Sequence, residues 1–311
     1  MESGYTDTPL NFDDLLPYAI TDGDIIVSEI LRAHKCYFYD ACSFRRHANL
    51  TPATAKSLLH YLADGKGIVL ITRGILMELA SYSGILETEY IRYIKNMSET
   101  GLPVLILYEE DLFTVMEACF SSNIAINGYL TWAVRMMKSP VSTIIDTLKK
   151  DNELEAAVMK GKHAEKGWVY KRFFEAVRNN KEAGDNLGDE LLAICLHILS
   201  NLPGEPDEKF CIITDDKGAA GKIDTLFRNT VAQHRGRKIV IFSTPKLLQV
   251  MWRDGAVEER ECLEELLRTG THGKITVLGT RLSDLRNREI SLTWEELAEL
   301  MIQPNGINIV F

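Results

Sequence analysis

Short, continuous apolar runs are the feature of this sequence that most restricts its fold. Residues 68–71, 211–213 and 239–242 have strand length and contain no alternating polar positions. Strands of this kind are typical of parallel sheets, which are buried on both faces. Segments with helical spacing separate these runs, such as the helix predicted to begin at Thr51-Pro52. The pattern therefore predicts an α/β protein in which a parallel sheet lies between helical layers.

Length and composition restrict the class of protein further. A chain of 311 residues that is 46% hydrophobic can bury one large core. The apolar runs are too short to cross a bilayer, and the first 14 residues are acidic and polar, unlike a signal peptide. We therefore expect a cytoplasmic protein with no membrane partner. The six cysteines form no C-x-x-C pair, which favours buried reduced thiols over disulfides or a zinc site.

The chain divides into four expected parts. Residues 1–33 are predicted to be an N-terminal extension, and residues 34–250 the main α/β domain. Residues 85–185 of that domain are mainly helical in pattern and are predicted to be an insertion. Residues 251–311 are predicted to form a small α+β appendage outside the catalytic part, with a capping box from Thr293 to Glu296.

Acidic residues stand at the ends of several predicted elements. Asp40 follows the aromatic strand 35–39, and Asp215 and Asp216 follow the strand 211–213. Asp189 begins a helix, and Glu78 lies on the helix after the strand 68–71. In an open α/β sheet the carboxyl ends of the strands and the helix N-termini face one crevice, so these acids are predicted to meet. Each acid alone also fits a local role, as a cap, a turn residue or a solvated side chain.

Familiar motifs of other enzyme classes are absent. The segment 216–223 resembles a phosphate-binding loop, but Asp216 stands where the first glycine belongs and Ile223 replaces the Ser or Thr that contacts magnesium. The sequence contains no G-x-G-x-x-G after a strand and no G-x-S-x-G elbow. An aspartate-nucleophile phosphatase would need a second acid at the position of Cys42.

The order and setting of the acids resemble the motifs of the PIN-domain nuclease family. Residues 37–43 resemble its hydrophobic strand, acid and nearby serine, and residues 71–79 resemble its strand exit and Glu-Leu motif. Residues 188–193 are similar to the motif in which an acid begins a helix, and residues 213–216 to the strand that leaves through Thr-x-Asp or Asp-Asp. The resemblance covers about residues 35–250, and it implies a PIN-like three-layer fold and a metal-dependent ribonuclease.

The resemblance also implies roles for the acids. Asp40, Asp189 and Asp216 are expected to bind the metal, with Glu78 as a further ligand or a residue that orients water. Asp215 competes with Asp216 for this role, although the Thr-x-Asp spacing favours Asp216. Oxygen-only ligands favour Mg²⁺ or Mn²⁺ over zinc, and the cation would relieve repulsion among the carboxylates. Ser43 and Thr214 are expected to orient carboxylates or waters.

Local basic clusters are the candidate RNA-binding residues. A formal charge of −9 argues against a protein that coats nucleic acid through bulk electrostatics, but local patches can still hold phosphates. In the segment 160–181 basic residues alternate with aromatics, which fits either single-strand binding or an ordinary amphipathic helix with inward aromatics. The candidates are Arg45, Arg46, Lys171, Arg172, Arg235 and Arg237.

The sequence is compatible with two classes of function and with several kinds of partner. The first is an endoribonuclease whose partner is an RNA substrate, with a toxin, defence or RNA-turnover role. The second is an inactive PIN-like module for RNA binding or assembly. An antitoxin or another protein partner is a further expectation from the family, as is a homodimer.

Overall fold

A five-stranded sheet forms the centre of the protein. The computed structural model describes residues 8–81, 83–137, 142–180, 187–234, 236–271, 273–281 and 286–311. All pairings in this sheet are parallel, and the strand order is β3-β2-β1-β4-β5. The strands are β1 (Lys35–Tyr39), β2 (Gly67–Thr72), β3 (Val104–Leu107), β4 (Phe210–Ile213) and β5 (Val240–Phe242). The predicted α/β class is thus confirmed, although β5 is shorter than the apolar segment that indicated it.

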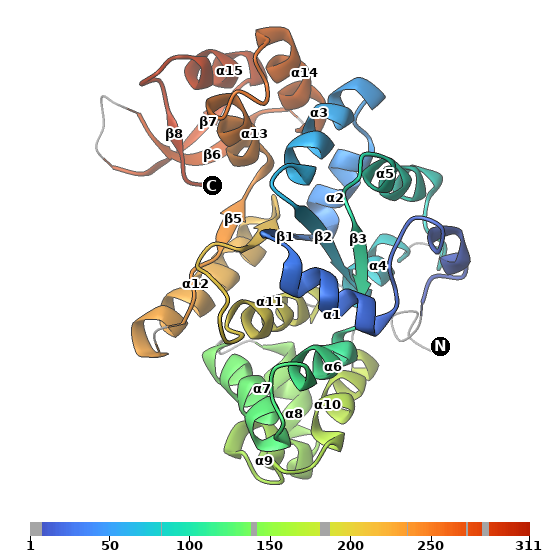
Figure 1. Cartoon of the computed structure of the whole chain (residues 1–311). Helices are drawn as coiled ribbons and strands as arrows, with labels where there is room; N and C mark the ends of the chain where they lie inside the picture. The colour runs from blue at the N-terminus through green and yellow to red at the C-terminus, as the bar shows by residue number, and fades with distance from the viewer. Residues whose placement is uncertain are drawn as a thin grey trace.

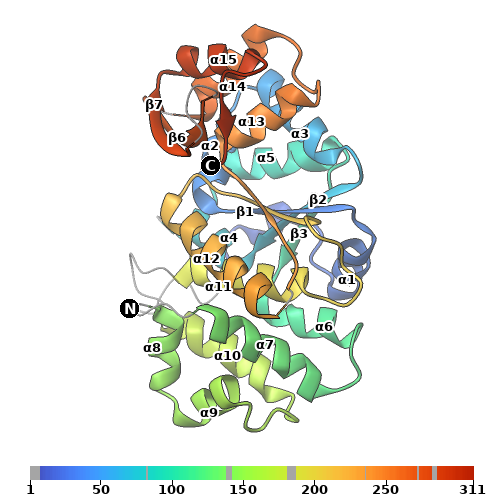
Figure 2. The same cartoon turned by 90° about the vertical axis from the view of Figure 1, so that its left-hand side faces the viewer.

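Helices cover both faces of this sheet (Figure 2). One layer contains α2 (Ala41–Ala48), α3 (Pro52–Ala63), α5 (Thr88–Glu99) and α13 (Thr244–Arg253). The opposite layer contains α1 (Gly23–Arg32), α11 (Leu187–Ser200) and α12 (Lys217–His234). A short helix, α4 (Arg73–Leu79), follows β2 directly and contacts both α2 and α11. The arrangement is a three-layer parallel α/β fold.

The direction in which strands are added reverses between β1 and β4. The chain places β2 and β3 on one side of β1, then returns to place β4 and β5 on the other side. Ligands of open α/β sheets bind at such a switch point, outside the carboxyl ends of the strands. Asp40 follows β1 directly, and Thr214, Asp215 and Asp216 follow β4. The topology alone therefore brings these residues to the expected binding edge.

The N-terminal segment extends the sheet at its β3 edge. It contains a 3-10 helix, η1 (Phe12–Leu15), followed by α1. Between them Ile20 forms a parallel bridge with Leu105, in which its N–H donates to the Val104 carbonyl at 2.8 Å. Asp22 caps α1 by accepting from the N–H of Ile25 at 3.0 Å. The expected N-terminal extension therefore contains a capped helix.

A group of helices connects β3 to α11 and lies below the sheet in Figure 1. It consists of η2 (Glu109–Asp111), α6 (Leu112–Glu117), α7 (Asn123–Met137), α8 (Thr143–Lys149), α9 (Asn152–Lys160) and α10 (Trp168–Asn179). Because β3 lies in the sheet and α5 covers it, this helical insertion begins after residue 107 and not at the expected residue 85. Helices α7 and α8 pack against α11.

The C-terminal unit is a small sheet with helices. Its elements are α14 (Arg260–Gly270), β6 (Ile275–Thr280), β7 (Arg288–Leu292), α15 (Trp294–Ile302) and β8 (Asn308–Ile309). The strands are antiparallel in the order β7-β6-β8, and the predicted capping box of Thr293 and Glu296 is present. Helix α13 runs across the expected boundary at residue 250 and contacts α14, α15 and β8. It therefore belongs to both units.

The helices and the cysteines can be compared with what the sequence predicts about membrane crossing and thiols. Among the helices of the described residues, none combines the length and the apolar character needed to cross a membrane. All six cysteines are free thiols, and Cys36, Cys195 and Cys211 are buried in the core. The predicted buried, reduced thiols are confirmed for those three residues.

Candidate active site at the carboxyl edge of the sheet

Asp40 lies at the exit of β1 and is almost fully buried (4% exposed). Its Oδ2 accepts hydrogen bonds from Thr214 Oγ1 and from Cys42 Sγ, both at 2.8 Å. Among the described residues these bonds reach only Oδ2, so Oδ1 keeps its acceptor capacity for a ligand. The expected role of Thr214, orienting a carboxylate, matches this geometry. Cys42 makes a contact of the same kind, and sequence reasoning did not identify it as a site residue.

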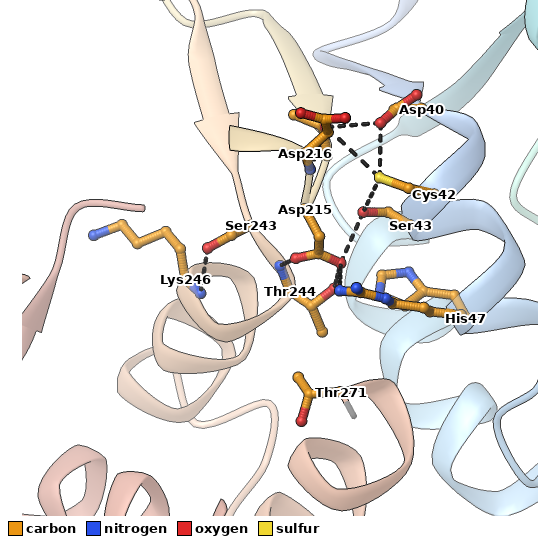
Figure 3. Close-up of polar contacts among 12 residues, drawn as sticks. Asp40, Cys42, Ser43, His47, Asp215, Asp216, Ser243, Thr244, Lys246 and Thr271 are labelled. Atoms are coloured by element: carbon orange, nitrogen blue, oxygen red, sulfur yellow. Dashed lines mark hydrogen bonds and ion pairs between the residues drawn. The ribbon is translucent and has the colours of Figure 1, made fainter. Parts of the chain in front are cut away.

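The neighbouring acids Asp215 and Asp216 point in different directions (Figure 3). Asp216 lies on the side of Asp40, whereas Asp215 points toward Thr244 and His47. Asp216 Oδ1 accepts from the N–H groups of Gly218 at 2.6 Å and Ala219 at 3.1 Å, which caps α12. The Asp216 carboxylate accepts no other hydrogen bond from the described part of the chain, so Oδ2 has no donor there.

Asp215 is surrounded by donors and is only 5% exposed. Oδ2 accepts from Ser43 Oγ at 2.9 Å and from Thr244 Oγ1 at 2.7 Å, and Oδ1 accepts from the Thr244 N–H at 2.7 Å. Arg46 adds an ion pair at 3.1 Å. A carboxylate with this set of partners has little capacity left for a metal ion. The geometry therefore favours Asp216 over Asp215, and Ser43 orients Asp215 and not a metal ligand.

His47 continues this network into the core. The hydroxyl hydrogen of Thr244 goes to Asp215, so the bond of 2.9 Å between Thr244 Oγ1 and His47 Nε2 requires His47 to donate. His47 Nδ1 then accepts from the Tyr39 hydroxyl, also at 2.9 Å. Burial lowers the pKa of His47 to about 4, so the imidazole is neutral at pH 7, as this pattern of bonds requires. The network locks α2 and α13 to the end of β4.

Asp189 and Glu78 complete the acidic side of the edge. Asp189 lies in the first turn of α11, and Glu78 lies near the end of α4. The two helices meet closely at Gly188: a Cβ atom at this position would lie 2.9 Å from Glu78 Oε2. Any larger residue at position 188 would push the Glu78 carboxylate away. The glycine that precedes the acid in the sequence motif therefore has a packing reason.

The pKa of Asp189 shows that the four carboxylates influence one another. Burial raises this pKa to about 6, and the negative charge of Asp40 is the next largest cause. Asp216 and Glu78 act in the same direction. Lys222 opposes them, because its Nζ lies 3.6 Å from Asp189 Oδ2. The structure thus places Asp40, Glu78 and Asp216 near enough to Asp189 for their charges to act on it.

The donor set suits a hard divalent cation in its chemistry. All four side chains offer carboxylate oxygens, the ligands that Mg²⁺ and Mn²⁺ prefer. Burial, and after it the charge of Asp40, raises the pKa of Asp189, and a bound cation would offset the repulsion between the carboxylates. Within the described residues, no three His, Cys, Asp or Glu side chains are placed closely enough to form a metal-binding group. The residues therefore fit the cation in charge and ligand type. In their present positions, a single carboxylate would bind the ion directly and the others would contact it through water.

Lys222 is a second site residue, after Cys42, that sequence reasoning missed. It lies on α12, one and a half turns after the Asp216 cap, and reaches back to Asp189. The segment 216–223 fails as a phosphate-binding loop. Read as a helix with an acidic N-cap, the same segment places a lysine near the crevice. Helical spacing was the signal that could have found it.

Glu190, next to Asp189, has a structural role. It is buried (1% exposed), and its Oε2 accepts from Ser142 Oγ at 2.9 Å and from the Ile144 N–H at 3.0 Å. These bonds attach the start of α8 to the start of α11. The acidic pair at the start of α11 is thus divided between a site residue and an anchor for the helical insertion.

The candidate RNA-binding arginines of α2 lie at the site but are engaged within the protein. Arg45 Nη2 donates to the Glu78 carbonyl at 2.6 Å, which fixes the end of α4. Arg46 pairs with Asp215, yet 35% of its side chain is exposed. Arg46 therefore retains N–H groups that face solvent beside the acidic edge.

Three other candidate RNA-binding residues, Lys171, Arg172 and Arg237, lie away from this edge. Arg172 forms ion pairs with Asp151 and Glu153, and Lys171, 75% exposed, lies 3.8 Å from Glu175. Both are on α10 in the helical insertion. Arg237 is exposed just before β5, at the opposite end of the sheet from the acids. Arg235 lies outside the described residues. The structure thus does not bring these basic residues to the carboxylates.

The aromatics that alternate with the basic residues of α10 are packed inward. Tyr170, Phe173 and Phe174 are at most 1% exposed. Trp168 is partly exposed, and the Arg172 guanidinium lies over its ring at 5.0 Å. The interpretation of this segment as an ordinary amphipathic helix is confirmed for the three buried rings, which cannot stack on bases.

Two cavities lie near α12. The larger one, about 680 Å³, is mainly apolar and lies between α12, β5 and the C-terminal residues. None of the four carboxylates lines it, so its size does not make it the reaction site. A polar cavity of about 300 Å³ is lined by Arg46, Asp215 and Lys217 together with residues of the C-terminal unit. This second cavity adjoins the acidic edge.

Comparisons of the chain with protein-family models, with curated proteins and with solved structures found no match in any of the three.

Proposed function

We propose that this protein is a metal-dependent ribonuclease that hydrolyses phosphodiester bonds at the acidic edge of its sheet. The observation that carries the proposal is the convergence of Asp40, Glu78, Asp189 and Asp216 from four separate elements. Asp40 and Asp216 follow the two strands between which the strand order reverses, which is the ligand-binding position of open α/β sheets. RNA as the substrate, and a PIN-like identity of the domain, are supported by the resemblance of the four sequence motifs.

Each acid has a distinct structural support for this role. Thr214 and Cys42 hold Asp40 through one oxygen, and the amides at the start of α12 hold Asp216 through one oxygen. The remaining oxygens can bind Mg²⁺ or Mn²⁺, directly or through water. Such an ion supplies a nucleophilic water at neutral pH and stabilises the leaving oxygen. Asp189 would bind the ion as a further ligand, and Glu78, whose carboxylate lies next to Gly188, would orient a water on it.

A second candidate is an inactive module for RNA binding or assembly, and Lys222 favours it. Its ammonium already lies 3.6 Å from Asp189 and supplies part of the positive charge that a metal would bring. In an inactive module this pair would persist and no ion would be needed. In the nuclease, a cation held by Asp189 would take over the charge that Lys222 supplies there. Metal binding therefore discriminates the two functions.

The direct test is incubation of the purified full chain with a mixed RNA pool and Mn²⁺, followed by mapping of the cleaved ends. We expect cleavage that a chelator stops, and a loss on the order of 10³-fold in Asp40→Asn and Asp189→Asn. Asp146→Asn, at an exposed acid of the insertion, is the matched control and should cleave like the parent. If Asp40→Asn cleaves as fast as the parent, the assignment of the active site is wrong.

Metal binding can be measured without activity. Mn²⁺ at a hundredfold excess over its dissociation constant should stabilise the parent by about 2.7 kcal/mol, because it binds only the folded state. The rise in melting temperature should be much smaller in Asp189→Asn and unchanged in Asp146→Asn. Equal shifts in all three proteins would favour the inactive module.

A further inference from the structure

The polar cavity of about 300 Å³ is built jointly by the α/β unit and the C-terminal unit. The α/β unit supplies one residue of α2, two residues that follow β4, and the start of α13. The C-terminal unit supplies the end of α14, the start of β6 and the last residue. The lining residues are Arg46, Asp215, Lys217, Ser243, Pro245, Thr271, Lys274, Ile275, Thr276 and Phe311.

The charge of this cavity is positive. Arg46, Lys217 and Lys274 line it, against a single acid, Asp215. Donors from Ser43, Thr244 and Arg46 already occupy the oxygens of Asp215, so this acid presents little free charge to the cavity. Lys217 shares its charge with Glu289 at 2.9 Å, at the rim. Lys274 is exposed and forms no ion pair with any residue that the structure describes.

The C-terminal wall of the cavity is held firmly in place. Gln249 of α13 is fully buried, accepts from the Ile309 N–H at 2.9 Å and donates to the Ile307 carbonyl at 3.0 Å. Lys246, also on α13, donates to the Ile309 carbonyl. Strand β6 pairs with β8 and so inherits this attachment. These contacts hold the sheet that contains β6 against α13, and Lys274 lies directly before β6.

The cavity lies directly beside the acidic edge. Asp216, a proposed metal ligand, is flanked in the chain by Asp215 and Lys217, and both line the cavity. The backbone of Asp216 is therefore bordered on both sides by residues of the cavity lining, about 3.8 Å away from Cα to Cα. Cationic side chains next to a cluster of acids are suited to a phosphate that is held but not cut.

We propose that this cavity binds a phosphate group of the RNA strand next to the one that is hydrolysed, with Lys274 and Arg46 as its cationic ligands. The proposal rests on the function proposed above, because it places the substrate relative to the acids. It gives the C-terminal unit, expected to lie outside the catalytic part, a role in positioning the strand. Phosphate oxygens are the ligand, and an RNA backbone or a free inorganic phosphate can supply them.

The test measures binding of a fluorescein-labelled 15-nucleotide single-stranded RNA to the full chain by anisotropy, with a chelator present so that nothing is cut. Lys274→Ala should bind about fivefold more weakly at 0.1 M salt and should lower the slope of log K against log salt by about 1. Arg268→Ala is the matched control: this arginine is exposed on the same unit, pairs only with Glu265 among the described residues, and does not line the cavity. Its RNA affinity should equal that of the parent.

Inorganic phosphate is the second probe, measured as a shift in melting temperature of the parent and of Lys274→Ala. Weaker RNA binding by Lys274→Ala, with no change in Arg268→Ala, supports the proposal. Unchanged RNA binding overturns it, whether or not inorganic phosphate stabilises the parent through Lys274. A phosphate shift without an RNA effect would identify the cavity as a site for the free anion.

Failure of this proposal and failure of the nuclease are distinguishable. If Lys274→Ala weakens binding but the parent does not cleave RNA in Mn²⁺, the cavity assignment stands and the proposed function falls. If the parent cleaves RNA and Lys274→Ala binds it normally, the nuclease stands and the cavity assignment falls.

Discussion

The exit of β4 separates two groups of acids that are similar in sequence and different in physics. On the side of α13, Asp215 receives hydrogen bonds from Ser43 and Thr244 and an ion pair from Arg46. On the side of α11, Asp189 lies near Asp40, Asp216 and Glu78, with Lys222 as its one ion-pair partner in the described chain. Asp215 stabilises the fold. On the α11 side, Asp40 and Asp216 each keep a carboxylate oxygen without a donor in the described chain, and the negative charges of the acids repel one another.

This difference shows how to separate structural acids from candidate ligands. A buried carboxylate that accepts hydrogen bonds from several donors does not need a cation. Carboxylates that lie next to other carboxylates need a cation to offset their repulsion. Sequence position cannot make the distinction, because Asp215 and Asp216 are adjacent. Three predictions, in order of decreasing effect, test the division.

The largest expected effect concerns cleavage of RNA. Asp216→Asn keeps a good N-cap for α12 and removes the charge, so cleavage in Mn²⁺ should fall on the order of 10³-fold. Asp215→Asn, assayed as folded protein, should stay within about tenfold of the parent, because its carboxylate faces its own donors. Initial rates on one labelled RNA give the comparison. Equal losses in both variants would abolish the division between the two groups.

The second effect concerns stability and has the opposite order. Asp215→Ala leaves Ser43, Thr244 and Arg46 without their acceptor, which should cost about 2–3 kcal/mol; the partial exposure of Arg46 keeps the cost below that of a fully buried pair. Asp216→Ala removes only a helix cap and should cost about 1 kcal/mol. Urea unfolding in the presence of a chelator measures both values. A larger loss in Asp216→Ala would contradict the structural role of Asp215.

The smallest effect is a pH dependence that belongs to Asp189. Burial and the charge of Asp40 raise its folded-state pKa from 3.8 to about 6, so between these values the folded protein holds a proton that the unfolded chain has released. Stability should therefore fall as pH rises from about 4 to about 6, by about 1–2 kcal/mol. Asp189→Asn should lack this contribution, while the control Asp146→Asn should retain it. Urea midpoints measured without metal across this range decide the matter.

Much of the fold could be predicted from local sequence. The apolar runs gave the parallel strands, and the caps at Thr51 and Thr293 marked two helix starts that the structure contains. The extent of the helical insertion was less accessible, because the segment near residue 104 reads as a strand without revealing that it pairs with β2. Membership of a sheet is decided by a distant partner.

Sequence could predict which acids belong to the candidate site. It could not predict which of them have a structural role and which keep oxygens free for a ligand. Asp40, Asp189 and Asp216 stand at element ends, a position visible in sequence. The engagement of Asp215 by Thr244, and the approach of Lys222 to Asp189, depend on how α12 and α13 pack against the sheet. The same holds for Lys274, which reaches the edge only because the C-terminal unit folds back onto α13.

The sequence by itself determined the α/β class and the acids at the element ends, because hydrophobic periodicity and capping are local properties of the chain. Tertiary structure alone decided which acids repel one another, which are satisfied, and that residues from the two units enclose one cationic cavity. The physical reason is range: hydrogen bonds and Coulomb interactions act over a few ångströms in space, and only the packed fold brings residues far apart in the chain within that distance.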